Sequence, residues 1–215
     1  MSTRVKSVFV SLCFLACSIV LCAHTGAQDQ PRTRIMVVPY IGDKEQFQSF
    51  RGIIETKIDR LKEDFPPKYA YTRDIHLEDA EKKPSDFEGF WRETGSLAIL
   101  SGIVFPQNQK SYVNSTFYLY DLKGNLGSDS VTLDLAIEPE EYGATRDTHS
   151  IVTLYALAMD AKRLGYPPDV VFRFLSRAYE ISTSLPNPAR RGDIVRVIEA
   201  IKREADSLRT QGGQP

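Results

Sequence analysis

The chain has 215 residues, of which 42% are hydrophobic, and 27 basic side chains nearly balance 28 acidic ones. This length and hydrophobic content predict one globular domain, or one domain with an appendage. The charges are interspersed along the chain, which gives no electrostatic basis for binding nucleic acid or an anionic membrane surface.

Residues 1–27 have the pattern of a cleaved secretory signal peptide. Arg4 and Lys6 precede an apolar run from Val8 to Ala23, and small residues then lead to a polar start at Gln28. The run falls short of the ~20 residues that a membrane-spanning helix needs. We therefore expect no stable membrane span after cleavage.

The cysteines indicate what kinds of chemistry the mature chain lacks. All three lie within the predicted signal peptide, at Cys13, Cys17 and Cys22. A chain cleaved after residue 27 therefore has no disulfide, no thiol nucleophile and no cysteine metal ligand. We expect a periplasmic location in a bacterium, with secretion as the alternative.

Residues 28–34 predict a flexible leader, and residues 35–137 predict an α/β domain. Apolar runs and helical periodicity place its elements in the order strand, helix, strand, helix, strand, strand, strand. The expected segments are strand 35–41, a five-turn helix after Asp43, strand 69–75, a short helix from Pro84 to Gly95, the hairpin 95–122 and strand 131–137. The fold class is α/β, with a mixed sheet of about five strands and helices packed on it.

The hairpin at 95–122 is the predicted centre of the sheet. Its first half is almost continuously apolar, as in a strand that is buried on both faces. Its second half alternates, with Tyr112, Asn114, Thr116, Tyr118 and Tyr120 on one side. We predict a central strand with an antiparallel neighbour.

Beyond the strands, residues 138–147 predict a linker and residues 148–209 a helical region. Three helices are expected there, at 148–164, at 169–183 and after Asn187-Pro188. Residues 210–215 predict a disordered tail. The three helices form a C-terminal appendage that either packs on the sheet or stands as a separate unit.

No catalytic, metal-binding or cofactor-binding motif is present in the mature chain. The nucleophile elbow, the P-loop and the dinucleotide fingerprint are absent. His76 and His149 are isolated in polar segments, which predicts two solvated surface histidines. A cluster of carboxylates at Glu138, Glu140 and Glu141 leaves open a hydrolase as a weaker alternative.

The tyrosines of the hairpin are the candidate binding residues. Tyr112, Tyr118 and Tyr120 share one face, and Tyr40, Tyr69 and Tyr71 lie on neighbouring strands of the predicted sheet. Aromatic side chains on a strand face usually form core under a helix. If the face is partly open, it is a surface for a partner or a ligand.

Several motifs within 35–137 resemble the amino-terminal domain family of the TolB translocation protein. The first strand reads Val-Val-Pro-Tyr, Leu100, Gly102 and Val104 fit the family's third strand, and Asp121 and Gly124 fit the turn that closes its hairpin. The resemblance implies a protein-binding domain of the bacterial envelope without catalytic activity.

We therefore expect an exported protein that is not an enzyme, binds no cofactor and acts through protein–protein interaction or assembly with an envelope partner. The alternative is a periplasmic module that binds a small ligand or glycan on the tyrosine-bearing face.

Overall fold

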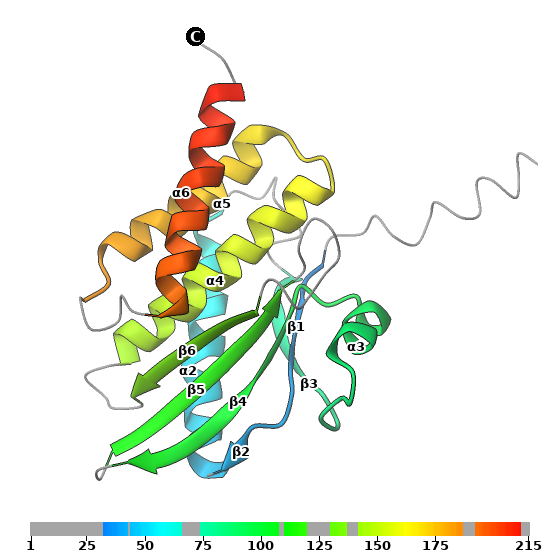
Figure 1. Cartoon of the computed structure of the whole chain (residues 1–215), viewed down its shortest axis with the longest axis vertical. Coiled ribbons are helices and arrows are strands. Elements are labelled where there is room, and N and C mark those ends of the chain that lie inside the picture. The colour runs from blue at the N-terminus through cyan, green and yellow to red at the C-terminus, as the bar shows by residue number, and fades with distance from the viewer. Residues whose placement is uncertain are drawn as a thin grey trace, which may run out of the picture. The chain divides into compact units, whose positions relative to one another are not determined.

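A single mixed β-sheet organises the computed structural model (Figure 1), with strands in the order β3-β1-β4-β5-β6 and the short β2 paired to β4. The structure describes residues 32–42, 44–65, 74–107, 110–119, 130–136, 142–186 and 192–211. Strands β1, β2, β3 and β4 pair in parallel, whereas β4, β5 and β6 pair antiparallel. The predicted mixed α/β sheet is confirmed.

The elements follow the predicted order along the chain. They are β1 (Arg34–Val37), β2 (Ile41–Gly42), α2 (Lys44–Glu63), β3 (His76–Asp79), α3 (Phe87–Thr94), β4 (Ala98–Gln107), β5 (Lys110–Leu119), β6 (Ser130–Ala136), α4 (Tyr142–Arg163), α5 (Pro168–Thr183) and α6 (Asp193–Gln211).

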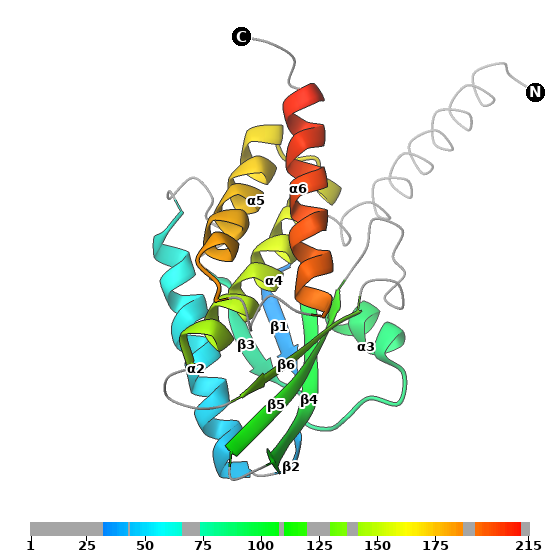
Figure 2. The same ribbon diagram turned by 60° about the vertical axis from the view of Figure 1, so that its left-hand side comes forward.

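Two layers of helices cover the sheet, one on each face (Figure 2). The apolar stripe of α2 is buried at Phe50, Ile54, Ile58 and Leu61, as its three- and four-residue spacing predicts. It packs with α4 on one face, while α3 lies on the other.

The alternation of side chains along the strands assigns each residue to one of these faces. Val113, Phe117 and Leu119 of β5 join the large core that α2 and α4 cover. Met36 of β1 and Ile99 of β4 belong to a smaller cluster under α3. The predicted alternation of β5 therefore separates its two faces correctly.

The C-terminal helices share the core of the sheet. Ile151 and Leu154 of α4, Phe174 of α5 and Ile201 of α6 lie in the same buried cluster as Val37 of β1. Helix α4 packs against α2, α5 and α6. Helix α6 runs through Gln211, into the segment that was predicted to be a tail.

A strand that the sequence pattern does not predict follows the predicted strand 69–75. It is β3 at His76–Asp79, in a segment that we expected to be a charged connector, and residues 66–73 lie outside the described part. Leu77 is its one buried side chain, so the apolar pattern that marks a strand is missing. Charged residues are tolerated there because β3 is an edge strand.

The prediction for His149 is wrong, because its side chain is 1% exposed and lies in the core. Helix α4 begins at Tyr142, within the segment predicted as a linker, and its first turns bury polar residues. These are Thr145, Thr148, His149, Ser150 and Thr153. Hydrophobic periodicity begins only at Ile151, which is why the sequence pattern misses this buried stretch.

Candidate functional site: the open end of the sheet

Two of the three candidate tyrosines lie on the same face of the sheet, as their spacing predicts. Tyr118 is paired with Ile99 and Tyr112 with Phe105 in the β4–β5 register, and all four face the side that carries α3. Tyr120 lies outside the described residues, as do Tyr69 and Tyr71.

Helix α3 covers the Tyr118 end of this face. Phe87 stacks on Tyr118 with ring centroids 4.2 Å apart and an interplanar angle of 19°. Next to this pair, Trp91 is 3% exposed and packs with Ile99. The helix ends at Thr94, and the next residue is Gly95, whose N–H donates to the Trp91 carbonyl and whose φ of 58° suits glycine. Tyr118 is therefore part of a small core.

The other end of the same face is open to solvent. Ile41 is 56% exposed, Ile103 is 44% exposed and Phe105 is 36% exposed, while Tyr112 is half-buried. Strand pairing makes these residues neighbours, because Ile41 is paired with Ile103 and Phe105 with Tyr112. We call these four residues the open end. No helix lies over it within the described part of the chain, and Figure 1 shows this end of the β4–β5 hairpin, next to β2, extending below α3.

The open end has an aromatic pair and no charge on its own side chains. The rings of Phe105 and Tyr112 stack with centroids 6.0 Å apart and an interplanar angle of 21°. Asn114 and Thr116 continue the same face along β5 and are uncharged as well. Exposed apolar groups gathered on one surface are typical of a site that binds another molecule.

A well-packed layer supports the open end from behind. Gly102 is the neighbour of Ile103, and the ring of Tyr40 lies so close that a Cβ on Gly102 would be 2.6 Å from it. The Tyr40 hydroxyl donates to Ser115 Oγ at 2.9 Å, and its ring contacts Phe50 of α2 at 5.6 Å. Tyr40 therefore packs on the face that α2 and α4 cover and is not part of the candidate site.

Burial raises the pKa of the Tyr40 hydroxyl well above its usual value, although the hydrogen bond with Ser115 opposes this shift. The hydroxyl consequently stays protonated and remains a hydrogen-bond donor at physiological pH. We expect Tyr40→Phe to lower the free energy of unfolding by about 1–2 kcal/mol, because Ser115, 0% exposed, loses this donor.

Urea denaturation would measure this loss, and Tyr112→Phe is the matched control. Tyr112 is half-exposed at the open end, so the loss of its hydroxyl should change the stability by less than about 0.5 kcal/mol. Equal effects of the two variants would contradict the assignment of Tyr40 to the buried layer.

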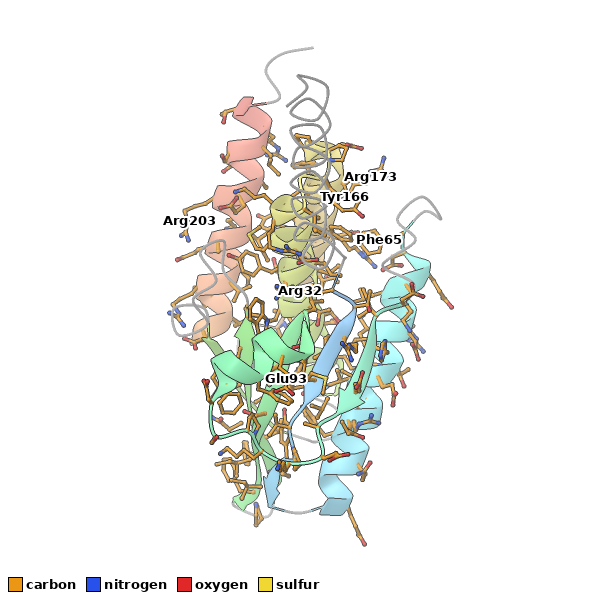
Figure 3. All side chains as sticks on the ribbon, turned by 90° about the vertical axis from the view of Figure 1, so that its right-hand side faces the viewer. Arg32, Phe65, Glu93, Tyr166, Arg173 and Arg203 are labelled. Atoms are coloured by element: carbon orange, nitrogen blue, oxygen red, sulfur yellow. The ribbon has the colours of Figure 1, made fainter. Side chains whose placement is uncertain are left out.

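A second polar cluster ties the start of the described chain to α4. Asp160 is 3% exposed and accepts a hydrogen bond from the backbone N–H of Arg32 at 3.2 Å and from Arg163 Nε at 3.1 Å. The Arg32 guanidinium lies 3.8 Å from the centre of the Trp91 ring. Figure 3 shows Arg32 between α3, marked by Glu93, and the C-terminal helices, where Tyr166 lies in the α4–α5 loop and Arg173 on α5. The geometry is that of a structural anchor.

A groove of about 410 Å³ lies between the end of α2 and α5. It is lined by Asp64, Phe65, Arg173, Ser176, Arg177 and Glu180. Arg177 donates to Asp64 at 2.8 Å and to Glu180 at 2.8 Å. Its charge is thus balanced by the groove's own carboxylates.

Among the described residues, no three His, Cys, Asp or Glu side chains gather as a metal site, and no helix is long and apolar enough to cross a membrane. Of the two histidines in the described part of the chain, His76 is exposed, as predicted, and its Nε2 lies 3.6 Å from Glu78. The carboxylates Glu138, Glu140 and Glu141 lie outside the described part of the chain.

No protein-family model matches this chain, and no curated protein matches it. Two solved structures are similar to part of it. TolB from Acinetobacter baumannii has 12% identity and a TM-score of 0.33 over 63% of this chain and 29% of the TolB chain. A PelC variant dodecamer from Paraburkholderia phytofirmans has 14% identity and a TM-score of 0.27 over 62% of this chain and 86% of that chain. The first is a weak structural resemblance to a TolB-like fold, and neither carries a functional argument.

Proposed function

We propose that this protein is exported to the bacterial periplasm and acts without catalysis, by binding another envelope protein through the open end of its sheet. The observation that carries the proposal is the exposure of Ile41, Ile103 and Phe105 side by side on a firmly backed sheet. The signal-peptide pattern of residues 1–27 supports export. We also propose that residues 35–137 are related to the TolB amino-terminal domain family, on the basis of their sequence motifs.

The chemistry of the open end favours a protein partner with an uncharged, apolar contact region. Burying Ile103 and Phe105 against such a partner removes apolar area from water, which stabilises the complex by about 25 cal/mol per Å² before the costs of association. A charged group placed on this surface would lose its hydration without gaining an ion pair from Ile41, Ile103, Phe105 or Tyr112.

A charge introduced at the open end should abolish binding without unfolding the protein. We expect Ile103→Asp to weaken partner binding at least tenfold, because an unpaired carboxylate would be buried in the complex. The side chain is 44% exposed in the free protein, so the free energy of unfolding should change by less than about 1 kcal/mol.

The experiment captures partners from envelope extract with the purified protein and then measures the dissociation constant of each captured protein. Val195→Asp is the matched control, because Val195 is 36% exposed on α6. The proposal requires that Ile103→Asp loses the partner and Val195→Asp retains it. A partner that binds both variants with unchanged affinity would contradict it.

The stacked Phe105–Tyr112 pair also favours a second candidate, the binding of a small ligand or glycan. A sugar ring stacks on such aromatic surfaces, and Asn114 lies beside the pair on β5. In a thermal-shift screen, a ligand present at about 100 times its dissociation constant should stabilise the protein by about 2.7 kcal/mol. Loss of this shift in Tyr112→Ala would favour the ligand over the protein partner.

A further inference from the structure

His149 occupies a closed site between three elements of the fold. Its ring lies 5.3 Å from that of Phe50 on α2 and 5.3 Å from that of Phe117 on β5, measured between centroids. The side chain itself belongs to α4 and is 1% exposed. One imidazole therefore packs α4 against both a helix and the sheet.

The hydrogen bonds of His149 define its neutral form. The Thr145 carbonyl lies 2.7 Å from Nδ1, so Nδ1 carries the proton and donates to that oxygen. Nε2 is buried and has no hydrogen-bond partner among the described residues. A proton added at Nε2 would create a buried charged donor on a ring that packs against Phe50 and Phe117, with no hydrogen-bond acceptor in place among the described residues.

Among the described residues, no charged group forms a hydrogen bond or an ion pair with the His149 ring. On α2 and α4, Lys57 and Asp147 pair with each other at 3.0 Å. The titratable hydroxyl of Tyr40 donates to Ser115. Nearby positions of the same two helices also carry Arg51, Glu55 and Arg146. Arg51 pairs with Glu55 and with Asp79.

We propose that His149 is an acid-sensitive latch, which holds α4 against α2 and β5 while its ring is neutral and releases the helix when Nε2 is protonated. The release would reach the layer behind the open end, because Phe50 contacts both His149 and Tyr40. The latch is a property of the isolated protein and does not depend on the proposed partner.

The pH range in which the latch opens follows from the direction of the pKa shift of His149. Burial lowers the pKa of His149 from 6.5 to about 4, and the hydrogen bond with Thr145 opposes this effect only in part. The unfolded chain takes up the proton first, near pH 6.5. The stability is therefore complete above this pH and falls as the pH decreases toward 4, where the unfolding constant is roughly 10²-fold larger from this group alone.

The test compares urea unfolding of the purified protein at pH 7.5 and at pH 4.5. We expect the wild type to lose far more stability in acid than His149→Met, because methionine fills the same space and does not titrate. His76→Gln, which removes the exposed histidine, should behave like the wild type. An equal loss in His149→Met and the wild type would overturn the proposal.

Hydrogen exchange and NMR test the latch in the wild type alone, so the result does not depend on whether His149→Met folds. After correction for the intrinsic rates, amides of α4 should lose more protection at pH 4.5 than amides of β1 and β4. The ring signals of His149 should titrate below pH 5. A midpoint near the ordinary value of 6.5, or uniform loss of protection, would show that the ring does not act as a latch.

Discussion

Replacing Asp160 by asparagine is expected to lower the free energy of unfolding by about 3–5 kcal/mol, since it removes the charge of a buried carboxylate that two arginines contact. The Asp160 carboxylate lies 3.7 Å from Arg32 Nε and 3.0 Å from Arg163 Nη2. Both arginine side chains are only 16% exposed. Asparagine keeps the shape but removes the charge and one of the two acceptor oxygens.

Urea denaturation at pH 7 measures the loss, and Asp59→Asn is the control. Asp59 pairs with Lys62 at 2.7 Å, but its side chain is 61% exposed, so solvent screens the pair. We expect a change of less than about 1 kcal/mol for this exposed pair. If Asp160→Asn is no more destabilising than Asp59→Asn, the cluster does not anchor the start of the chain.

The second large effect is expected at Gly102, where alanine should lower the free energy of unfolding by at least about 2 kcal/mol. A Cβ at this position would lie 2.1 Å from the Asn114 carbonyl oxygen and 2.6 Å from the Tyr40 ring. The ring could move, but the carbonyl belongs to the paired strand β5. One of the two central strands would have to shift.

Gly52→Ala is the matched control for this change. Gly52 lies in the exposed part of α2, and a Cβ there would meet nothing within 4 Å. Alanine is favoured over glycine in a helix, so we expect this variant to gain about 0.5–1 kcal/mol. Thermal denaturation would show opposite signs for the two variants. A neutral Gly102→Ala would mean that the strands can separate there at little cost.

The sequence predicts the mixed sheet well because its central elements have clear periodicity. Val113 and Phe117 alternate with Tyr112 and Tyr118, and this pattern correctly separates the two faces of β5. Strand β3 was not predictable in the same way. In β3, Leu77 alone among four residues is buried, so no alternation is visible.

The candidate site could be predicted only in part. Spacing places Tyr112 and Tyr118 on one face, but it contains no information on how far α3 extends over that face. The structure separates the two residues, because Phe87 stacks on Tyr118 whereas Tyr112 stays at the open end. Ile41 and Ile103 were missed because their contact depends on the parallel pairing of β2 with β4.

Buried polar residues are the other kind of feature that sequence patterns miss. His149 lies between polar residues in the sequence, so its surroundings in the chain indicate exposure. Its burial results from Phe50 and Phe117, which belong to elements distant in sequence. A helix that begins with a buried polar stretch has no hydrophobic pattern to mark its start.

The contact between Arg32 and Asp160 has a consequence for the order in which the chain acquires its structure. The two residues are separated by 128 positions, so this contact can form only after α4 has been synthesised. Contacts between such distant residues form slowly, because a long loop must close first. A chain that emerges from the ribosome or from a translocation channel with its N-terminus first would thus complete this contact only when about three quarters of its length is available.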